Sequence, residues 1–296
     1  MLQTKYFKQL NIFAESDNVT SVKFSPDNNK VALSSNNGQI QIWDVCMRQE
    51  IHTLVGHSDC VNEVEFSTDG NMLLSCSNDE TIGIWDVESG TQLLQLREHS
   101  HWVIGAKFSS DGLAIVSWSN DGKILSWDVT SGIMTLGLEV HFMCVLTVQF
   151  SPNGHIVVSC SEDNTIQLWD ARTLQVVQEF IGHSGCVQSA QFSPDNRTLV
   201  SCSEDHSIRI WDLKSAKQVR TLQGHSDSVL KARFSQDGLM VVSCSDDNTI
   251  RLWDVASGQE IQRLHGHLSS VTAVDISPDT TTIMSSSHDG TVRLWG

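Results

Sequence analysis

The chain has 296 residues, and its 19 Lys and Arg stand against 35 Asp and Glu, a formal net charge of −16 at pH 7. This excess disfavours binding to nucleic-acid phosphates or anionic lipid, so we expect basic proteins or peptides as partners rather than nucleic acid or a membrane. No apolar run approaches the roughly 20 residues of a membrane span, and residues 1–15 lack the apolar core of a signal peptide. We therefore expect an intracellular protein, cytoplasmic or nuclear, with reduced cysteines.

A tryptophan recurs every 42 residues, at Trp43, Trp85, Trp127, Trp169, Trp211, Trp253 and Trp295. Self-similarity at one period predicts a repeat architecture, and units of roughly 40 to 45 residues ending in Trp-Asp have the spacing of four-stranded propeller blades. The repeats use almost the whole chain. We predict a single domain over residues 1–296, with blades at about 14–55, 56–97, 98–139, 140–181, 182–223, 224–265 and 266–296 plus 4–13.

Each unit predicts four short strands, as residues 182–223 illustrate. Val187 to Phe192 alternates apolar and polar residues, and residues 193–196 have the composition of a tight turn. Further strands are predicted at 198–203, 207–211 and 218–222. Helical periodicity is absent. The sequence therefore predicts an all-β, seven-bladed β-propeller with four antiparallel strands per blade.

The units resemble the repeats of the WD-repeat β-propeller family over the whole chain. The resemblance rests on the Trp-Asp pairs from Trp43-Asp44 to Trp253-Asp254, on Gly-His pairs, and on an Asp six residues before most of the tryptophans. It implies a non-enzymatic scaffold that binds a protein or peptide and needs no cofactor. An alternative is a sensor or substrate-targeting module of a larger multidomain signalling, ATPase or ubiquitin-ligase protein.

The two ends of the chain complement each other. The last unit stops at its third strand, while Phe7 to Phe13 lies one period before the fourth-strand segment Gln49 to Val55. The resemblance implies that the N-terminal strand completes the last blade and closes the ring. Closure would leave no blade with an open strand edge.

Most units carry His, Ser, Asp and Trp at fixed offsets, as in His57, Ser77, Asp79 and Trp85, in His183, Ser203, Asp205 and Trp211, and in His225, Ser245, Asp247 and Trp253. His, Ser and Asp could form a hydrolase triad. A catalytic site is needed once, however, whereas this set recurs around the ring. A buried indole N–H needs an acceptor, and Ser, His and Asp can form a chain that supplies one. We predict a structural hydrogen-bond network, altered in the first blade by Glu15 and Asn37.

Three cysteine pairs lie 16 residues apart across a hairpin turn, namely Cys60 with Cys76, Cys144 with Cys160, and Cys186 with Cys202. A zinc site would need a fourth ligand that these spacings do not supply, and a disulfide would need an oxidising compartment. We therefore predict free thiols packed as small core residues, and no metal.

The same two columns hold Trp102 and Trp118 in the third unit. Either the two rings repack one blade, or Trp102 reaches the rim of the central channel and anchors a partner. The neighbouring His101, and Phe142 and Met143 in the next unit, where most other units have Ser, Asp or Gly, are consistent with an anchor. The sequence leaves both interpretations open.

The strand order places the loop before the first strand and the loop between the second and third strands on one face. Acidic residues fall on this face, namely Asp59, Glu162, Glu204, Asp227 and Asp246, whereas Lys30, Arg197 and Lys214 fall on the opposite face. The simpler interpretation is solvated loop carboxylates. The sharper hypothesis is an acidic, partly aromatic face that captures a Lys- or Arg-containing peptide by charge complementarity and cation–π contact.

Overall fold

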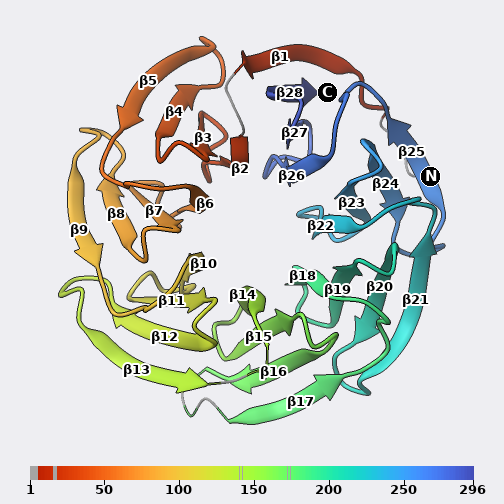
Figure 1. The fold of residues 1–296 in the computed structure, drawn as a ribbon. Coiled ribbons are helices and arrows are strands. Elements are labelled where there is room, and N and C mark those ends of the chain that lie inside the picture. The colour runs from red at the N-terminus through yellow and green to blue at the C-terminus, as the bar shows by residue number, and fades with distance from the viewer. Residues whose placement is uncertain (1–5, 16–18, 140, 142, 172, 174) are drawn as a thin grey trace.

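The computed structural model describes residues 6–15, 19–139, 141, 143–171, 173 and 175–296, with only the backbone at 11–15 and 139. These residues form 28 strands and no helix, and the strands make seven four-stranded antiparallel sheets around a central opening (Figure 1). The predicted all-β, seven-bladed propeller is confirmed. Since the described residues contain no helix, they contain none long and apolar enough to cross a membrane.

In six blades the four strands run in chain order from the central opening outwards, and in the seventh blade the first strand of the chain lies outermost, beside the last. The strands are β1 (Gln9–Glu15); β2 (Val19–Phe24), β3 (Lys30–Ser35), β4 (Ile40–Asp44) and β5 (Gln49–Leu54); β6 (Val61–Phe66), β7 (Met72–Ser77), β8 (Ile82–Asp86) and β9 (Gln92–Leu96); β10 (Val103–Phe108), β11 (Ala114–Ser119), β12 (Lys123–Asp128) and β13 (Met134–Glu139); β14 (Val145–Phe150), β15 (Ile156–Ser161), β16 (Ile166–Asp170) and β17 (Val176–Phe180); β18 (Val187–Phe192), β19 (Thr198–Ser203), β20 (Ser207–Asp212) and β21 (Lys217–Gln223); β22 (Val229–Phe234), β23 (Met240–Ser245), β24 (Ile250–Asp254) and β25 (Glu260–Leu264); and β26 (Val271–Ile276), β27 (Ile283–Ser287) and β28 (Thr291–Trp295).

A Ser-x-Asp turn joins the first two strands of a blade. In the fifth blade the Ser193 hydroxyl donates to Asp195 Oδ1 at 2.6 Å and accepts from the Thr198 N–H at 3.0 Å. Asn196 in the same turn has φ 57°, in the left-handed region that Asn tolerates. The turn thus holds β18 and β19 in the register that pairs Val187 with Ser203.

The apolar core lies between blades, because each sheet buries its faces against its neighbours. One cluster packs Ile166 and Leu168 of β16 against Leu199 of β19 and Trp211 of β20. Six further clusters of this kind repeat around the ring. A blade therefore shares its core with both neighbours.

The N-terminal strand closes the ring. β1 pairs antiparallel with β28, in a sheet with the order β1-β28-β27-β26, and Lys8 and Gly296 exchange two backbone hydrogen bonds of 2.9 Å (Figure 1). Just before β1, Phe7 is 1% exposed in a cluster with Trp295, and its backbone N–H donates to the Gln262 side chain at 2.9 Å. The predicted closure is confirmed.

Deleting residues 1–13 should unfold or aggregate the protein, because β28 would become an exposed edge and the Phe7 site would be empty. Losing the buried Phe7 side chain alone is expected to lower the free energy of unfolding by about 3–5 kcal/mol. Calorimetry should detect the loss, with a deletion of residues 1–5 as the control because it keeps Phe7 and β1. An unchanged melting temperature in the 1–13 deletion would contradict this role.

Candidate functional site

A hydrogen-bonded chain of four side chains occupies the middle of each blade from the second to the seventh. In the fifth blade Trp211 Nε1 donates to Ser201 Oγ at 2.8 Å, His183 Nε2 lies 2.8 Å from the same oxygen, and His183 Nδ1 lies 2.9 Å from Asp205 Oδ2. A carboxylate only accepts, so Nδ1 carries the histidine proton and Nε2 accepts the serine O–H. The chain therefore runs from Trp to Ser to His to Asp.

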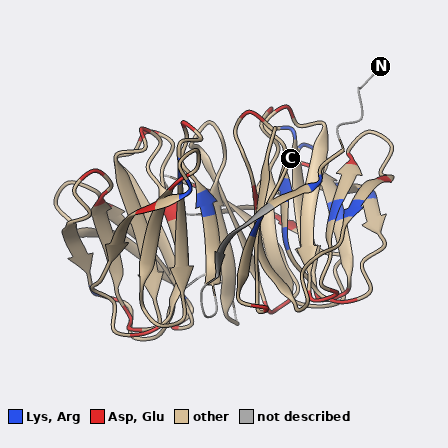
Figure 2. Cartoon of the chain, turned by 90° about the horizontal axis from the view of Figure 1, so that it is seen from above, with Lys and Arg blue, Asp and Glu red and all other residues tan. Residues whose placement is uncertain are grey.

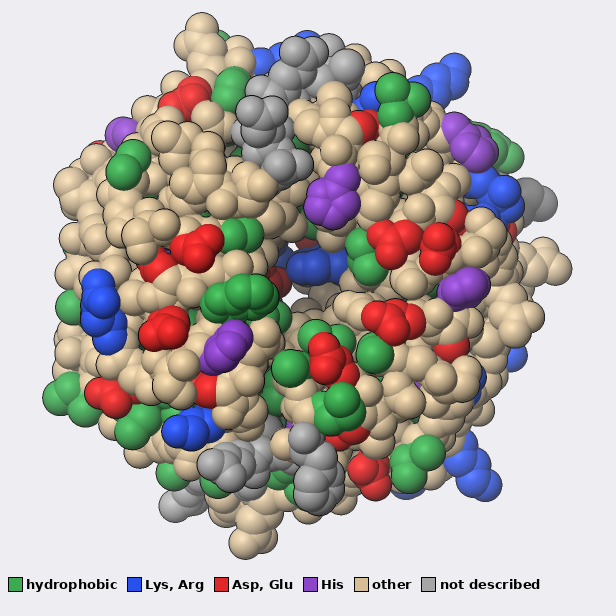
Figure 3. Space-filling view, viewed as in Figure 1, with side chains coloured by type: hydrophobic (Ala, Val, Ile, Leu, Met, Phe, Trp, Pro, Cys, Tyr) green, Lys and Arg blue, Asp and Glu red, His purple; other side chains and the backbone are tan. Residues whose placement is uncertain are grey.

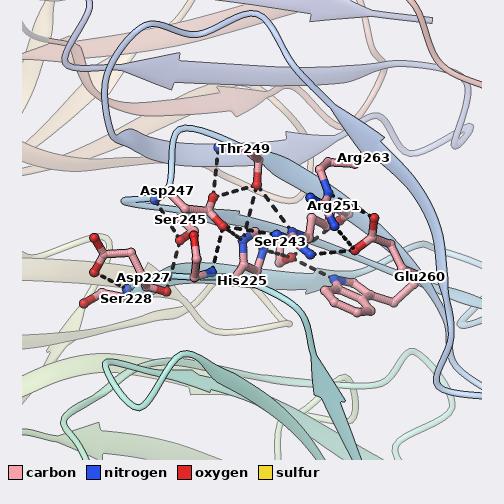
Figure 4. Close-up of polar contacts among 12 residues, drawn as sticks. His225, Asp227, Ser228, Ser243, Ser245, Asp247, Thr249, Arg251, Glu260 and Arg263 are labelled. Carbon is pink, nitrogen blue, oxygen red and sulfur yellow. Dashed lines mark hydrogen bonds and ion pairs between the residues drawn. The ribbon is translucent and has the colours of Figure 1, made fainter.

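The same chain links Trp85, Ser75, His57 and Asp79; Trp127, Ser117, His99 and Asp121; Trp169, Ser159, His141 and Asp163; Trp253, Ser243, His225 and Asp247; and Trp295, Ser285, His267 and Asp289. Figure 4 shows it in the sixth blade, buried between strands. Its serines are fully buried and its repetition is regular, so it supports the blades.

The serine predicted for this network is wrong by two residues: Ser201 binds the indole, and not Ser203. Ser203 lies at the end of β19, where its hydroxyl accepts from the Asp205 N–H at 3.0 Å and donates to the Gly185 carbonyl at 2.9 Å. Ser77 and Ser245 form the same pair of bonds in their turns. Sequence spacing could not separate the two serines, because alternate residues of a strand point to the same side.

Arginine extends the network in the last three blades, which the sequence analysis missed. Arg251 is buried, and its guanidinium lies 3.4 Å from Asp247 Oδ2 and 2.6 Å from Glu260 Oε2 (Figure 4). Arg209 and Arg293 also pair with the network aspartates of their blades. The sequence could have indicated this extension, because the residue two positions before each Trp is Gln, Gly or Leu in the first four repeats and Arg in the last three.

The first blade has a different arrangement. Leu33 occupies the position of the network serine, and Trp43 Nε1 instead donates to Gln41 Oε1 at 3.4 Å. Asn37 keeps the turn by accepting from the Ser35 hydroxyl at 2.5 Å. The Glu15 side chain lies outside the described residues. The first blade therefore lacks the network serine, and Gln41 is one acceptor for its tryptophan.

Burial and hydrogen bonding move the network pKa values in fixed directions. Burial lowers the pKa of His99, His183, His225 and His267 below their ordinary value of 6.5, against the opposing effect of the partner aspartates. Burial alone would raise the pKa of Asp205, but hydrogen bonds from Ser207, His183 and the Ser184 N–H hold it well below 3.8. These four histidines are therefore held neutral and Asp205 ionised in the folded protein.

A ring of loop residues surrounds the channel on the face formed by the loops that precede the first strands. In each blade from the second to the seventh, a backbone N–H just after the second strand donates to a carbonyl just before the first strand. The donors are Asn78, Asn120, Glu162, Glu204, Asp246 and His288, and the acceptors are Cys60, Trp102, Cys144, Cys186, Ser228 and Ser270. We call these twelve residues the rim. It brings Glu162, Glu204 and Asp246 to equivalent positions on consecutive blades.

The two unusual tryptophans of the third blade have different environments. Trp102 is 47% exposed at the rim, and its ring lies 5.4 Å from the His101 ring. Trp118 is 1% exposed and donates to the Leu146 carbonyl of the fourth blade at 3.2 Å. A Cβ on Gly105 would lie 2.1 Å from the Trp118 ring, so glycine makes room for it. The interpretation that both rings repack one blade is therefore wrong for Trp102 and holds only for Trp118, and the role of Trp102 as a partner anchor stays a prediction.

The other predicted binding residues lie on the same face, apart from Phe142, which is outside the described residues. Asp59 and Asp227 are exposed and cap their own loops through the next backbone N–H, and Met143 is exposed. Leu268, which the sequence analysis did not select, is 83% exposed in the column that holds Ser58, Ser184 and Ser226 in other blades. Figure 3 shows acidic, apolar and histidine side chains grouped around the opening.

The predicted separation of charge between the two faces is wrong, since Asp and Glu occur at both edges of the propeller (Figure 2). The opposite face carries the aspartates of the turns between the first and second strands, such as Asp237. Their oxygens already accept hydrogen bonds: Asp237 Oδ1 accepts from the Ser235 hydroxyl at 2.6 Å and from the Leu239 N–H at 3.0 Å. The turn aspartates of the opposite face are therefore engaged in local hydrogen bonds, as are Asp59, Asp227 and the network aspartates on the rim face.

The eight cysteines are free thiols, and four of them are fully buried, including Cys76, Cys160 and Cys202 of the predicted pairs. Burial raises their pKa; that of Cys244 rises to about 12. Within the described part of the chain, no three His, Cys, Asp or Glu side chains gather as metal ligands. The four buried cysteines are small apolar core residues as predicted. The prediction of core packing is wrong for the first cysteine of each pair, which is only partly buried, namely Cys60, Cys144 and Cys186.

The geometry defines a closed repeat propeller with a buried structural network and an open polar rim. The family model for the WD domain, G-beta repeat (WD40), matches the chain seven times, at residues 7–44, 48–86, 90–128, 133–170, 174–212, 216–254 and 258–296. The comparison with curated proteins finds no match. The chain therefore belongs to the WD40 family.

Each matched repeat contains the outer strand of one blade and the three inner strands of the next. The first, residues 7–44, contains β1 together with β2, β3 and β4, so the offset between repeat and blade is what closes the ring. Propellers of this family are typically protein-interaction scaffolds, generally without enzymatic activity, and they generally bind proteins or peptides.

Replacing Ser201 by Ala should lower the free energy of unfolding by about 1–3 kcal/mol, because it leaves the buried Trp211 N–H without its acceptor. Chemical denaturation gives the value. In a Trp211→Phe background the same serine change should cost less, since the indole donor is gone. An equal cost in both backgrounds would show that the serine acts independently of the tryptophan.

Acidification should destabilise the fold in two stages. Between the lowered folded pKa of the four histidines and their ordinary 6.5, the unfolded chain binds more protons, so stability falls as the pH drops below 6.5. The lowered pKa of the network aspartates adds a second loss below 3.8. Each histidine contributes at most about 1.4 kcal/mol per pH unit.

Denaturation at constant ionic strength between pH 8 and pH 4 measures this dependence. His225→Gln should show a shallower decline between pH 7 and pH 5 than the unaltered protein, because one titrating group is removed. Stability that stays constant across that interval would contradict the assignment of neutral histidines.

Proposed function

We propose that the protein is a non-enzymatic scaffold that binds a basic segment of a protein partner across the rim. The observation that carries this proposal is the position of three rim carboxylates on consecutive blades, around the same opening as an exposed tryptophan. The family supplies the general role as an interaction scaffold, and the rim residues suggest the chemistry of the partner.

The rim carboxylates Glu204 and Asp246 can accept further hydrogen bonds. Glu204 accepts one hydrogen bond from Gln188 Nε2 at 2.9 Å, and Asp246 accepts one from the Ser270 hydroxyl of the next blade. A carboxylate can accept about four, so a Lys or Arg of a partner could bind without displacing these contacts. The turn aspartates of the opposite face already accept several bonds, which favours the rim as the binding surface.

The rim glutamates also place negative charge beside two partly buried thiols. The pKa of Cys144 is raised by burial and then by the Glu162 charge, and the pKa of Cys186 is raised by burial and then by Glu204. A negative potential at the mouth of a channel attracts a cationic segment and speeds its association. Rim affinity should therefore weaken as salt increases.

Exposed apolar groups complete the surface. The Trp102 ring, half-exposed beside His101, can stack on a partner guanidinium or alkyl chain. Met143 and Leu268 add exposed apolar area on the same face. Aromatic anchors with an acidic surround suit a peptide that combines Lys or Arg with apolar residues. The free thiols fit a reducing compartment, so we place this activity inside the cell.

Glu204→Lys and Trp102→Ala should each weaken the binding of labelled Lys- and Arg-rich peptides about tenfold at low salt, measured by fluorescence anisotropy. The matched control is Glu88→Lys, which makes the same charge change at an exposed turn of the opposite face. Equal binding by Glu204→Lys, Trp102→Ala and the unaltered protein would rule out the rim as the site.

A further inference from the structure

A second set of charges lies inside the channel, below the rim. One residue of each inner strand contributes, at a spacing of 42 residues: Lys23, Glu65, Lys107, Gln149, Gln191, Arg233 and Asp275. We call these seven residues the channel ring. They line two hollows of about 200 and 430 Å³ whose walls include turn residues of the opposite face, such as Pro26 and Pro152. Figure 3 shows Lys or Arg side chains deep in the opening.

Two of the cations are paired within the channel. Lys107 Nζ lies 2.9 Å from Glu63 Oε1 and 2.8 Å from Glu65 Oε2, and Lys23 Nζ lies 3.3 Å from Glu65 Oε2. Although burial would raise the pKa of Glu65, the two lysines hold it at about 2. The pKa of Lys107 is raised, because the carboxylates outweigh its burial. These charges compensate each other.

Arg233 is paired less closely than the two lysines. Burial would lower its pKa, but the charges of Asp275, Glu65 and Glu63 raise it. Only 9% of the residue is exposed, its Nε lies 3.5 Å from Asp275 Oδ1, and this buried Nε forms no hydrogen bond within the described part of the chain. Asp275 Oδ2 already accepts from the Phe24 N–H at 3.0 Å. A buried donor without an acceptor is costly, so the guanidinium is suited to an additional acceptor.

The channel ring has an excess of positive charge, with three cations and two carboxylates. The smaller hollow is lined by Lys23, Lys107 and Arg233 but only one ring carboxylate, Glu65. Burial and then repulsion from Arg233 lower the pKa of Lys23, which agrees with a local excess of positive charge.

Glutamines fill the sector between Lys107 and Arg233. Gln191 Oε1 accepts a hydrogen bond from the Phe234 N–H at 2.8 Å. The amide nitrogen of Gln191 is therefore the donor that remains for a ligand. Gln149 lines the same hollow as Lys107 and Arg233. This sector therefore offers cationic and amide donors and no ring carboxylate, the composition of an anion site rather than a cation site.

We propose that this hollow binds a tetrahedral oxyanion of the phosphate class, either free or at the end of a phosphorylated side chain. An arginine edge can take two phosphate oxygens in parallel hydrogen bonds, and the anion supplies the acceptor that Arg233 lacks. Turn residues of the opposite face line the same hollow, so an ion or a side-chain tip would enter from that face. The site is separate from the rim and does not depend on the function proposed there.

Titration calorimetry with inorganic phosphate, at constant ionic strength and pH 7.5, tests the proposal. Gln191→Glu should weaken phosphate binding about tenfold or more, because the introduced carboxylate competes for Arg233. That variant keeps the acceptor for the Phe234 N–H, as Asp275 does for Phe24, so its fold should be retained. Arg233→Gln should weaken binding equally, whereas the control Arg197→Gln, at a largely exposed turn, should leave it unchanged.

A parallel titration with a phosphoserine peptide and its unphosphorylated form separates the two sources of the anion. Inorganic phosphate binding that Gln191→Glu abolishes supports a free-ion site, and binding of the phosphopeptide alone, with the same sensitivity, supports a phosphorylated side chain. No binding of either at tens of millimolar, or binding that both variants leave unchanged, overturns the proposal and leaves the channel as a hydrated ion-pair cluster.

Discussion

The buried indole N–H of the repeated tryptophan is the constraint on which each blade depends. The ring fills the space between two sheets, and its polar atom needs an acceptor at a depth that water does not reach. Ser201 meets this need for Trp211, and His183 and Asp205 then satisfy the serine and anchor the turn. The chain ends on a carboxylate near the loop face, so core packing and loop position are coupled through four side chains.

That coupling leaves the loop ends available for binding. The network aspartates hold the turns through backbone N–H groups, as Asp247 does for Ser226 and Thr249, so neighbouring rim positions can vary without loss of the fold. The rim residues do vary. The position before the first strand holds cysteine or serine in most blades and Trp102 in one, and the position after the second strand is acidic in three consecutive blades. A scaffold of this kind keeps its architecture constant while its surface chemistry changes from blade to blade.

The carboxylates of this protein differ in how many hydrogen bonds and ion pairs they already form. The turn aspartates accept local hydrogen bonds. Glu63 and Glu65 form ion pairs with Lys107 inside the channel. The rim carboxylates can still accept further hydrogen bonds. The net charge of −16 therefore says little about any one surface. Arg233 differs from the channel lysines, because the carboxylate that pairs with it, Asp275, also pairs with Lys23 and accepts a backbone N–H.

The sequence by itself predicted the seven blades and their four strands, because a 42-residue period repeats seven times, while the ring closure was implied by the family resemblance and appears in the structure as the pairing of β1 with β28. It also placed His, Asp and Trp of the network correctly in register. Only the tertiary structure decided which serine binds the indole, that Trp118 is buried while Trp102 is exposed, and that seven residues 42 apart meet in one channel. The reason is physical: periodicity specifies which strands form, whereas a side chain's partners depend on atoms that adjacent blades bring within a few ångströms.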